Sequence, residues 1–254
     1  MNKLKKGDIV GRISYHKDVL FEITKIIKTS NKEEIYILKG ITERIEADSI
    51  KEDLEIMDKR VVDAKIKNVE NKMYNRIEES LKNSKYYIYK NKKILKSKEE
   101  RRSNKLIYTG KILHLDGDKR YSDKSLKYYK SLGLNAIVKN IPENKQAQVV
   151  KNLLERYEPD ILVITGHDGM IKKGTAFNDI YNYRNSRHFI NTVREAKKWS
   201  SNRKDLAIFA GACQSYYEAI MSEGANFASS PRKNNDRFYR SINSCRKNCY
   251  NREH

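Results

Sequence analysis

The sequence predicts an α/β protein in which a small SH3-like β-barrel precedes a larger domain with a mostly parallel sheet. Short runs that alternate apolar and polar residues fill the chain up to about residue 57. From about residue 106 the hydrophobic period switches repeatedly between strand-like and helix-like spacing. The chain has 254 residues, of which 38% are apolar, and this is enough for one medium domain and a small one.

The first 57 residues contain about five expected strands, separated by turns such as KTSNKE. These strands are 7–14, 19–27, 33–40, 43–48 and 54–57. So many short strands in so little chain favour a small closed barrel of the SH3-like type. Barrels of this kind bind peptides, RNA or other domains, so the architecture alone identifies no ligand.

Residues 58–105 are expected to form a basic helical connector without proline or glycine. Helical spacing relates six apolar positions, namely Val62, Ile66, Val69, Met73, Ile77 and Leu81. Lysine and arginine are concentrated in 91–105, which is typical of a solvated linker or an exposed helix face.

Residues 106–231 alternate strands and helices, and this pattern predicts a mostly parallel sheet that is covered on both faces. The expected strands are 111–116, 135–140, 160–166, 206–211 and a last one from 225. The expected helices are 122–133 with a serine cap, 144–158, 186–200 and 213–224. Right-handed crossovers would bring the carboxyl ends of all these strands to one edge.

Reactive side chains follow three of these strands. His167 comes after strand 160–166, Cys213 comes after strand 206–211, and Asp116 and Asp118 lie at the end of the first strand. Ligand sites in open α/β sheets lie outside the carboxyl ends of the strands, and neighbouring strands are about 4.8 Å apart. We therefore expect the imidazole and the thiol to approach each other at this edge.

This arrangement fits a cysteine nucleophile. Cys213 is expected to open the helix 213–224, whose N-terminus would lower the pKa of the thiol. His167 would act as general base and then as general acid, and the N–H groups of Gly169 and Cys213 are the candidate oxyanion donors. Two simpler interpretations stay open, because a lone cysteine after an apolar strand is usually a small buried residue and GHDG is also typical of a turn.

The blocks ITGHDG (164–169) and ACQS (212–215) resemble the signature of the caspase, clostripain and gingipain clan of cysteine peptidases. In that clan one apolar strand ends in His-Gly, and a second ends in a small residue followed by the catalytic cysteine. The resemblance implies a caspase-like α/β peptidase domain with His167 and Cys213 as its catalytic residues. Here Asp168 is inserted between the histidine and Gly169, which departs from the clan.

Longer stretches resemble a family of sporulation-specific proteases of spore-forming bacteria. They include KKGDIVGRISY, HLDGD, YEPDILVITGHDG, NDIYNYRNSRHF and AIFAGACQSYYEAIMSEGANFASSP. The resemblance covers the barrel and the α/β domain to about residue 231. It implies an endopeptidase that processes spore coat proteins and proteins of the germination machinery, that cleaves after arginine, and that uses no cofactor.

Arginine preference requires a carboxylate in the specificity pocket, because a desolvated guanidinium calls for an acidic partner. Several arginine-specific clan members carry an acid two residues before the cysteine, where this chain has Gly211. The candidates are Asp116 and Asp118 first, followed by Asp168 and Asp179. The DGD segment is equally typical of a turn in which the aspartates bond their own backbone.

The tail 232–254 is basic and has almost no apolar pattern. It fits a disordered tail, and a zinc site of Cys245, Cys249 and His254 is disfavoured because the spacing is unusual and a fourth ligand is lacking, so no metal is expected. We favour a shifted reading frame near Arg232, which resequencing of the gene would test.

The net charge of +20, from 53 basic and 33 acidic residues, attracts polyanions whatever the function. Nonspecific nucleic-acid binding, supported by the expected barrel and many tyrosines, is therefore the alternative function, and docking on spore coat proteins as a scaffold is another. No segment has the length of a signal peptide core or a membrane span, and three distant cysteines suit a reducing compartment. We expect a cytoplasmic protein of the sporulating cell, with association with the spore coat as the alternative, and no membrane partner.

Overall fold

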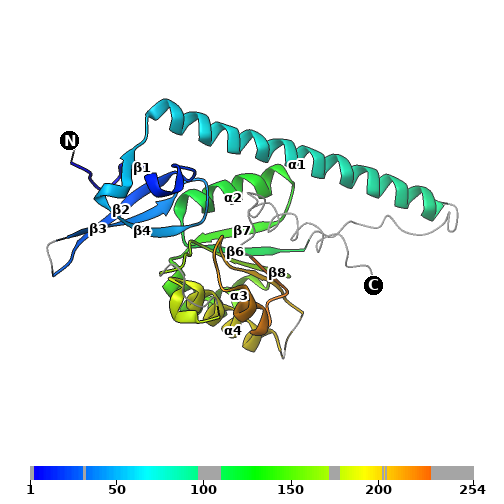
Figure 1. Ribbon diagram of the computed structural model, residues 1–254. Helices are drawn as coiled ribbons and strands as arrows, with labels where there is room; N and C mark the ends of the chain where they lie inside the picture. The colour runs from blue at the N-terminus through cyan, green and yellow to red at the C-terminus, as the bar shows by residue number, and fades with distance from the viewer. Residues whose placement is uncertain are drawn as a thin grey trace.

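The computed structural model describes residues 3–30, 33–96, 110–171, 178–201, 203 and 205–229. One antiparallel sheet lies near the N-terminus and one parallel sheet lies in the second half of the chain. A long helix starts beside the first sheet and runs across the second (Figure 1). The predicted combination of two sheets with different pairing is confirmed.

The N-terminal sheet has five antiparallel strands in the order β4-β3-β2-β1-β5. They are β1 (Ile9–Arg12), β2 (Phe21–Lys28), β3 (Glu34–Gly40), β4 (Glu46–Ile50) and β5 (Leu54–Ile56). Inward side chains such as Val10, Ile23 and Leu38 are fully buried, as the alternation in the sequence predicts. Within the described residues no ladder joins β4 to β5, so the closed barrel that we expected is not found.

The connector is a single helix, α1 (Lys59–Lys96). Two of its predicted apolar positions, Met73 and Ile77, are buried against the parallel sheet with Val163 and Phe209. The helix therefore contributes to the core of the second sheet as well as joining the two sheets.

The parallel sheet has the strand order β10-β9-β8-β6-β7. Its strands are β6 (Ile112–Asp116), β7 (Ala136–Asn140), β8 (Ile161–Thr165), β9 (Ala207–Ala210) and β10 (Phe227–Ala228). The chain moves from β6 to β7 in one direction and then returns to β8 on the other side of β6. The reversal falls between β6 and β8, and ligands of doubly wound sheets bind at such a point.

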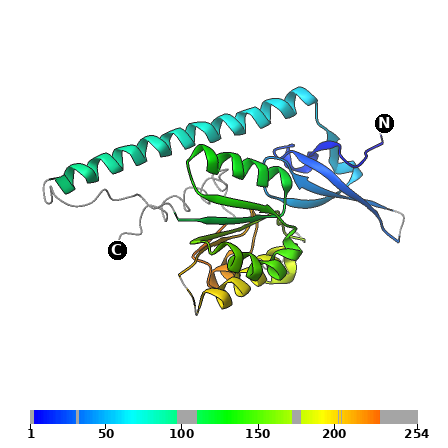
Figure 2. The same cartoon turned by 180° about the vertical axis from the view of Figure 1, so that it is seen from behind.

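Helices cover both faces of the parallel sheet (Figures 1 and 2). They are α2 (Lys119–Ser131), α3 (Glu143–Tyr157), α4 (Ser186–Ser200) and α5 (Tyr217–Ser222). One face carries Leu113 and Leu115 and packs against α3, α4 and α5. The other face carries Ile112 and packs against α1 and α2. This alternation along β6 places buried residues on both faces and confirms the predicted covering.

Two predicted helix starts are wrong. Helix α2 begins at Lys119 because Asp118 accepts a hydrogen bond from the Arg120 N–H, so the cap is this aspartate and not Ser122. Helix α5 begins at Tyr217, and Cys213 lies in the turn before it. The thiol therefore does not open a helix, and the helix-terminus argument for a lower thiol pKa does not apply.

Replacing Met73 by alanine should lower the free energy of unfolding by about 2–4 kcal/mol, because the side chain is 4% exposed and its removal leaves a cavity between α1 and the sheet. The Val61→Ala variant is the matched control, since this residue of the same helix is 44% exposed and should change stability by less than about 0.5 kcal/mol. Equal stability of the two variants in urea unfolding would contradict the packing of α1 on the sheet.

Candidate active site

The carboxyl ends of β8 and β9 bring His167 and Cys213 to the same edge of the sheet. The two strands are parallel neighbours, with Ile164 opposite Ala210, and each residue follows its strand after a short turn. Both residues contact the loop 40–45 that joins β3 and β4. The His167 Nε2 lies 3.2 Å from the Gly40 carbonyl oxygen, and the Arg44 N–H donates to the Cys213 Sγ at 3.2 Å.

The loop 40–45 docks on the segment after His167 through backbone pairing. Ile45 forms a parallel bridge with Asp168, in which the Glu46 N–H donates to the Asp168 carbonyl at 2.9 Å. A Cβ on Gly169 would lie 2.0 Å from the Glu46 carbonyl oxygen, so only glycine permits this approach. The N-terminal sheet thus forms one wall of the site, which sequence reasoning did not anticipate.

His167 is fully buried and uncharged at neutral pH. Burial, together with the positive charges of Lys39 and Arg44, lowers the pKa of its imidazole to about 4. A carbonyl can only accept, so the contact with Gly40 assigns the ring proton to Nε2. The Nδ1 then carries the lone pair, and among the described residues it has no hydrogen-bond donor. This nitrogen is the available base.

Cys213 is partly buried and is the one cysteine within the described residues. Its turn is held by Ser215, whose hydroxyl accepts a hydrogen bond from the Ala212 N–H at 2.8 Å. The Arg44 N–H at the sulfur would favour the thiolate, because a hydrogen bond to the charged form stabilises it.

Asp116, a predicted substrate-binding residue, is fully buried and already paired with a guanidinium. The Arg44 Nη2 lies 2.6 Å from its Oδ2, and the Thr165 hydroxyl donates to the same oxygen at 2.9 Å. Burial would raise the pKa of Asp116, but the charge and hydrogen bond of Arg44 lower it to about 2. The Arg44 guanidinium also lies 4.1 Å from the centre of the Tyr121 ring. Asp116 therefore binds an arginine in this structure, and that arginine belongs to the chain itself.

Asp118 lies beside the histidine. Its Oδ2 is 3.9 Å from the His167 Nδ1, while its Oδ1 caps α2. Burial would raise the pKa of Asp118, but the His167 imidazole in its protonated form, Arg120 and Lys39 lower it. Asp179, another predicted substrate-binding residue, is exposed and caps the short helix η3 (Ile180–Asn182).

Asp168 and Gly169 bond to each other in this structure. The Gly169 N–H, a predicted oxyanion donor, points to the Asp168 Oδ1 at 2.8 Å. Asp168 itself has no exposed surface, so its carboxylate faces the protein interior and not a substrate. Both predicted roles stay untested, and each would require this local arrangement to change.

Three residues of the site were not predicted from the sequence. Arg44 is one of many basic residues, and Glu143, whose Oε1 accepts from the His167 N–H at 2.8 Å, is a helix residue distant along the chain. His114 lies within β6, where its ring lies 2.7 Å from the Thr165 hydroxyl and 3.2 Å from the Tyr129 hydroxyl. An inward polar residue in an otherwise apolar strand was the available hint for His114.

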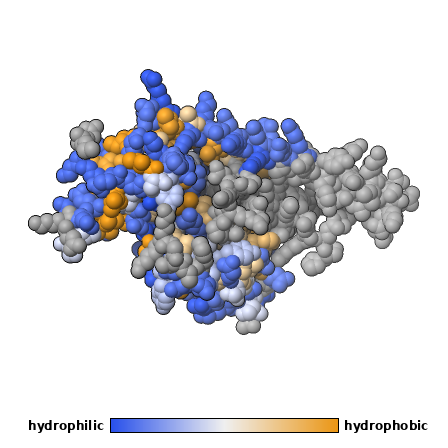
Figure 3. Space-filling view, viewed as in Figure 1, coloured by the Kyte–Doolittle hydropathy of each residue, from blue (hydrophilic) through white to orange (hydrophobic). Residues whose placement is uncertain are grey.

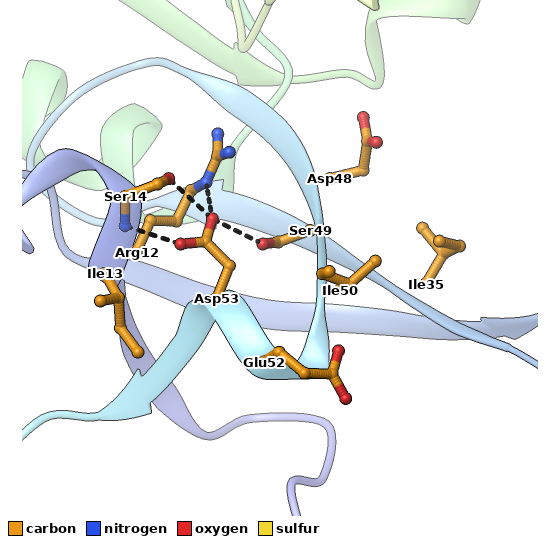
Figure 4. A pocket seen from close by; sticks show the side chains of 9 residues that line it. All are labelled: Arg12, Ile13, Ser14, Ile35, Asp48, Ser49, Ile50, Glu52 and Asp53. Carbon is orange, nitrogen blue, oxygen red and sulfur yellow. Dashed lines mark hydrogen bonds and ion pairs between the residues drawn. The ribbon is translucent and has the colours of Figure 1, made fainter.

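A separate shallow pocket lies on the N-terminal sheet (Figure 4). Asp53 lies at its centre and accepts hydrogen bonds from Arg12, Ser14 and Ser49. These four polar groups bond one another. Apolar surface gathers over the N-terminal sheet in Figure 3. The exposed large apolar residues of this part of the chain include Ile13, Ile27, Ile50 and Ile56.

Among the described residues no group of histidine, cysteine and acidic side chains has a geometry suited to a metal ion. The disfavoured zinc ligands Cys245, Cys249 and His254 lie outside the described residues, as does the rest of the tail. No helix in the described part of the chain combines the length and apolar character needed to cross a bilayer.

Comparisons with known proteins identify the class as a peptidase. The model of the family described as YabG peptidase U57 matches residues 5–250, a range that includes most of the tail that we singled out. The sporulation-specific protease YabG of Bacillus subtilis (strain 168) is 40% identical over 229 residues, which are 90% of this chain and 79% of that protein. The chain therefore belongs to the YabG peptidase family, and the predicted resemblance is confirmed.

Among solved structures, the N-terminal receiver domain of RstA from Klebsiella pneumoniae matches with a TM-score of 0.34 and 10% identity. The match covers 56% of this chain and 99% of that domain.

The buried His114 makes stability depend on pH. Burial lowers its pKa to about 4, whereas an unfolded histidine titrates near 6.5, so the unfolded state takes up the proton first and stability is lost as the pH falls from 6.5 to 4. The His114→Asn variant should lose about 3 kcal/mol less than the wild type between pH 7 and pH 4. Urea unfolding at several pH values measures this difference, with the exposed His16→Asn variant as control. Parallel curves for wild type and His114→Asn would contradict it.

Proposed function

We propose that this chain is a sporulation-associated cysteine endopeptidase in which Cys213 is the nucleophile and His167 the general base. One observation carries the proposal: in a member of a peptidase family, an imidazole with an unprotonated Nδ1 and a thiol stand at neighbouring strand ends and contact the same six-residue loop. The neutral His167 supports a base role at pH 7, because a general base must be unprotonated before it reacts.

The reaction that these groups support has two stages. The His167 Nδ1 takes the thiol proton while the Cys213 Sγ forms a bond to the carbonyl carbon of the scissile peptide. The C–N bond then breaks, and the imidazolium returns its proton to the leaving amine. Water next attacks the thioester with His167 again as base, which releases the acid product and restores the thiol. Gly169 and Cys213 remain the candidate N–H donors to the oxyanion, and the Gly169 N–H would first have to leave the Asp168 Oδ1.

The fold supports a caspase-like assignment of the peptidase domain, over residues 106–231. The central strands follow the order second, first, third, fourth and fifth, and the histidine and cysteine follow the third and fourth strands. The SH3-like assignment of residues 1–57 has narrower support, from five antiparallel strands with the short helix η2 (Lys51–Asp53) between the last two. Residues 58–105 would then be the helical connector.

The substrates that we propose are spore coat proteins and proteins of the germination machinery. The support is the similarity to the sporulation-specific protease YabG of Bacillus subtilis. The alternative of nucleic-acid binding has no support from the family, and the acidic side chains at the strand edge do not favour an anionic ligand.

Replacing Cys213 by alanine, or His167 by alanine, should reduce peptide-bond cleavage at least about 1,000-fold, because each variant lacks a group that exchanges the proton or the acyl group. The assay incubates each variant with a spore coat protein mixture and sequences the termini of the products. His188→Gln is the matched histidine control and should keep wild-type activity. Wild-type activity in a folded Cys213→Ala variant would overturn the assignment.

Cleavage after arginine, which we also propose, depends on an acid near the base. Asp116 is supported by its pairing with Arg44, because that contact has the chemistry that a substrate arginine would need, although Arg44 must leave before a substrate can take its place. Asp118 is supported by its position 3.9 Å from the His167 Nδ1, and the arginine that it contacts, Arg120 at 3.5 Å, is exposed and not buried like Arg44.

Alanine variants of Asp116 and Asp118 test this pair. Removing the specificity acid should lower the ratio of kcat/KM for arginine peptides to kcat/KM for alanine peptides by about 100-fold or more, because only the charged substrate loses its partner. Asp116→Ala should in addition lower both values, because it breaks the ion pair with Arg44. Fluorogenic peptides that differ only in the residue before the scissile bond measure the ratio. Unchanged arginine preference in both folded variants would exclude both residues.

A further inference from the structure

The carboxylate of Asp168 accepts several hydrogen bonds at the strand edge. It is fully buried, and burial raises its pKa to about 6 despite the hydrogen bonds that lower it. The Gly169 and Asn185 N–H groups donate to its Oδ1 at 2.8 Å each, and the Ser186 hydroxyl donates to its Oδ2 at 2.5 Å. The nearby Ser215 hydroxyl also lowers the pKa of Asp168. Three donors at hydrogen-bond distance thus occupy the carboxylate.

The two serines extend these contacts to both sides of Cys213. The Ser186 oxygen accepts a hydrogen bond from the Tyr216 N–H at 2.8 Å, after the cysteine. The Ser215 oxygen accepts one from the Ala212 N–H at 2.8 Å, before it. A serine hydroxyl has one proton, and Ser186 directs it to the carboxylate, which leaves its oxygen lone pairs for the backbone. The turn that carries the thiol is therefore held from the residue next to His167.

We propose that Asp168 is a positioning residue that sets the Cys213 turn at a fixed distance from the His167 imidazole. The inference rests on the proposed roles of His167 and Cys213. Through its backbone Asp168 also pairs with Ile45 of the loop 40–45, whose Arg44 N–H donates to the Cys213 Sγ. One residue thus connects the histidine, the turn of the cysteine and the loop that contacts both.

An acceptor-only group is needed at this position. Asparagine has nearly the shape of aspartate, but an NH2 group replaces one of the carboxylate oxygens. This group can only donate hydrogen bonds, so it would face the hydroxyl or N–H donors that now bond to an oxygen lone pair. The Asp168→Asn variant should therefore keep the packing and release one of the serines. The substrate-binding surface stays intact, since Asp168 has no exposed area.

The test is steady-state kinetics of the full chain on a fluorogenic peptide with arginine before the scissile bond. Asp168→Asn should lower kcat about 100-fold with KM changed less than about twofold, because a misplacement of about 1 Å between reacting groups has a cost of this size. Asp123→Asn, an exposed aspartate of α2, is the matched control and should behave as wild type. A folded Asp168→Asn variant with wild-type kcat would overturn the proposal.

A second measurement separates positioning from stability. Ser215→Ala and Ser186→Ala each remove one hydroxyl, and each should lower kcat while the thermal midpoint falls by only a few degrees. The double variant Ser215→Ala/Asp168→Asn should lower kcat by a smaller factor than the product of the factors for the two single variants, because both residues act on one network. Fully multiplicative losses, or serine variants with wild-type kcat, would refute the network, and these serine variants remain informative if Asp168→Asn does not fold.

The outcome for Cys213→Ala keeps this inference distinct from the proposed function. If that variant is inactive and Asp168→Asn is fully active, the proposed roles of His167 and Cys213 are supported and the positioning role of Asp168 is refuted. If Cys213→Ala retains activity, the proposed function itself falls.

Discussion

The ion pair between Arg44 and Asp116 is the interaction on which the arrangement of this site depends. Both side chains are nearly inaccessible to water, and their separation of 2.6 Å joins a loop of the N-terminal sheet to the end of β6 in the second sheet. Taking two charges out of water costs several kcal/mol per ion, so the pair forms only because close geometry and further hydrogen bonds offset that cost. Here Thr165 and the Asp118 N–H supply those further bonds to Asp116.

This interaction explains why the histidine is neutral and oriented. Once Arg44 is fixed, the loop 40–45 lies against the edge of β8, its Gly40 carbonyl meets the His167 Nε2, and the imidazole is removed from water. Burial then lowers the pKa of His167, and the nearby cation adds to the effect. The protonation state of His167 is thus set by a segment that lies more than a hundred residues earlier in the chain.

The sequence was sufficient for those features that local periodicity encodes. The strands of both sheets and the helix 186–200 were predicted because apolar residues recur at strand or helix spacing, and the common edge of His167 and Cys213 follows from parallel pairing. The start of α2 was missed because Asp118 and Ser122 are both good caps, and only the fold decides which of them meets a free N–H. The helix that we predicted from Cys213 starts only at Tyr217, because the N–H groups around the thiol bond to serine hydroxyls in a turn.

The docking of the two sheets could not be predicted in the same way, because it depends on contacts between distant residues that have no common pattern. Arg44 is one basic residue in a chain with 53 of them, and nothing in its neighbours marks it as buried. The insertion of Asp168 between His167 and Gly169 was visible, but it looked like a departure from a motif. In the structure the same residue supplies a strand-like backbone pair to Ile45 and an acceptor to the serines beside Cys213. A histidine followed directly by glycine would have no side chain at this point, so the inserted carboxylate accounts for how this chain joins its thiol, its imidazole and its N-terminal sheet.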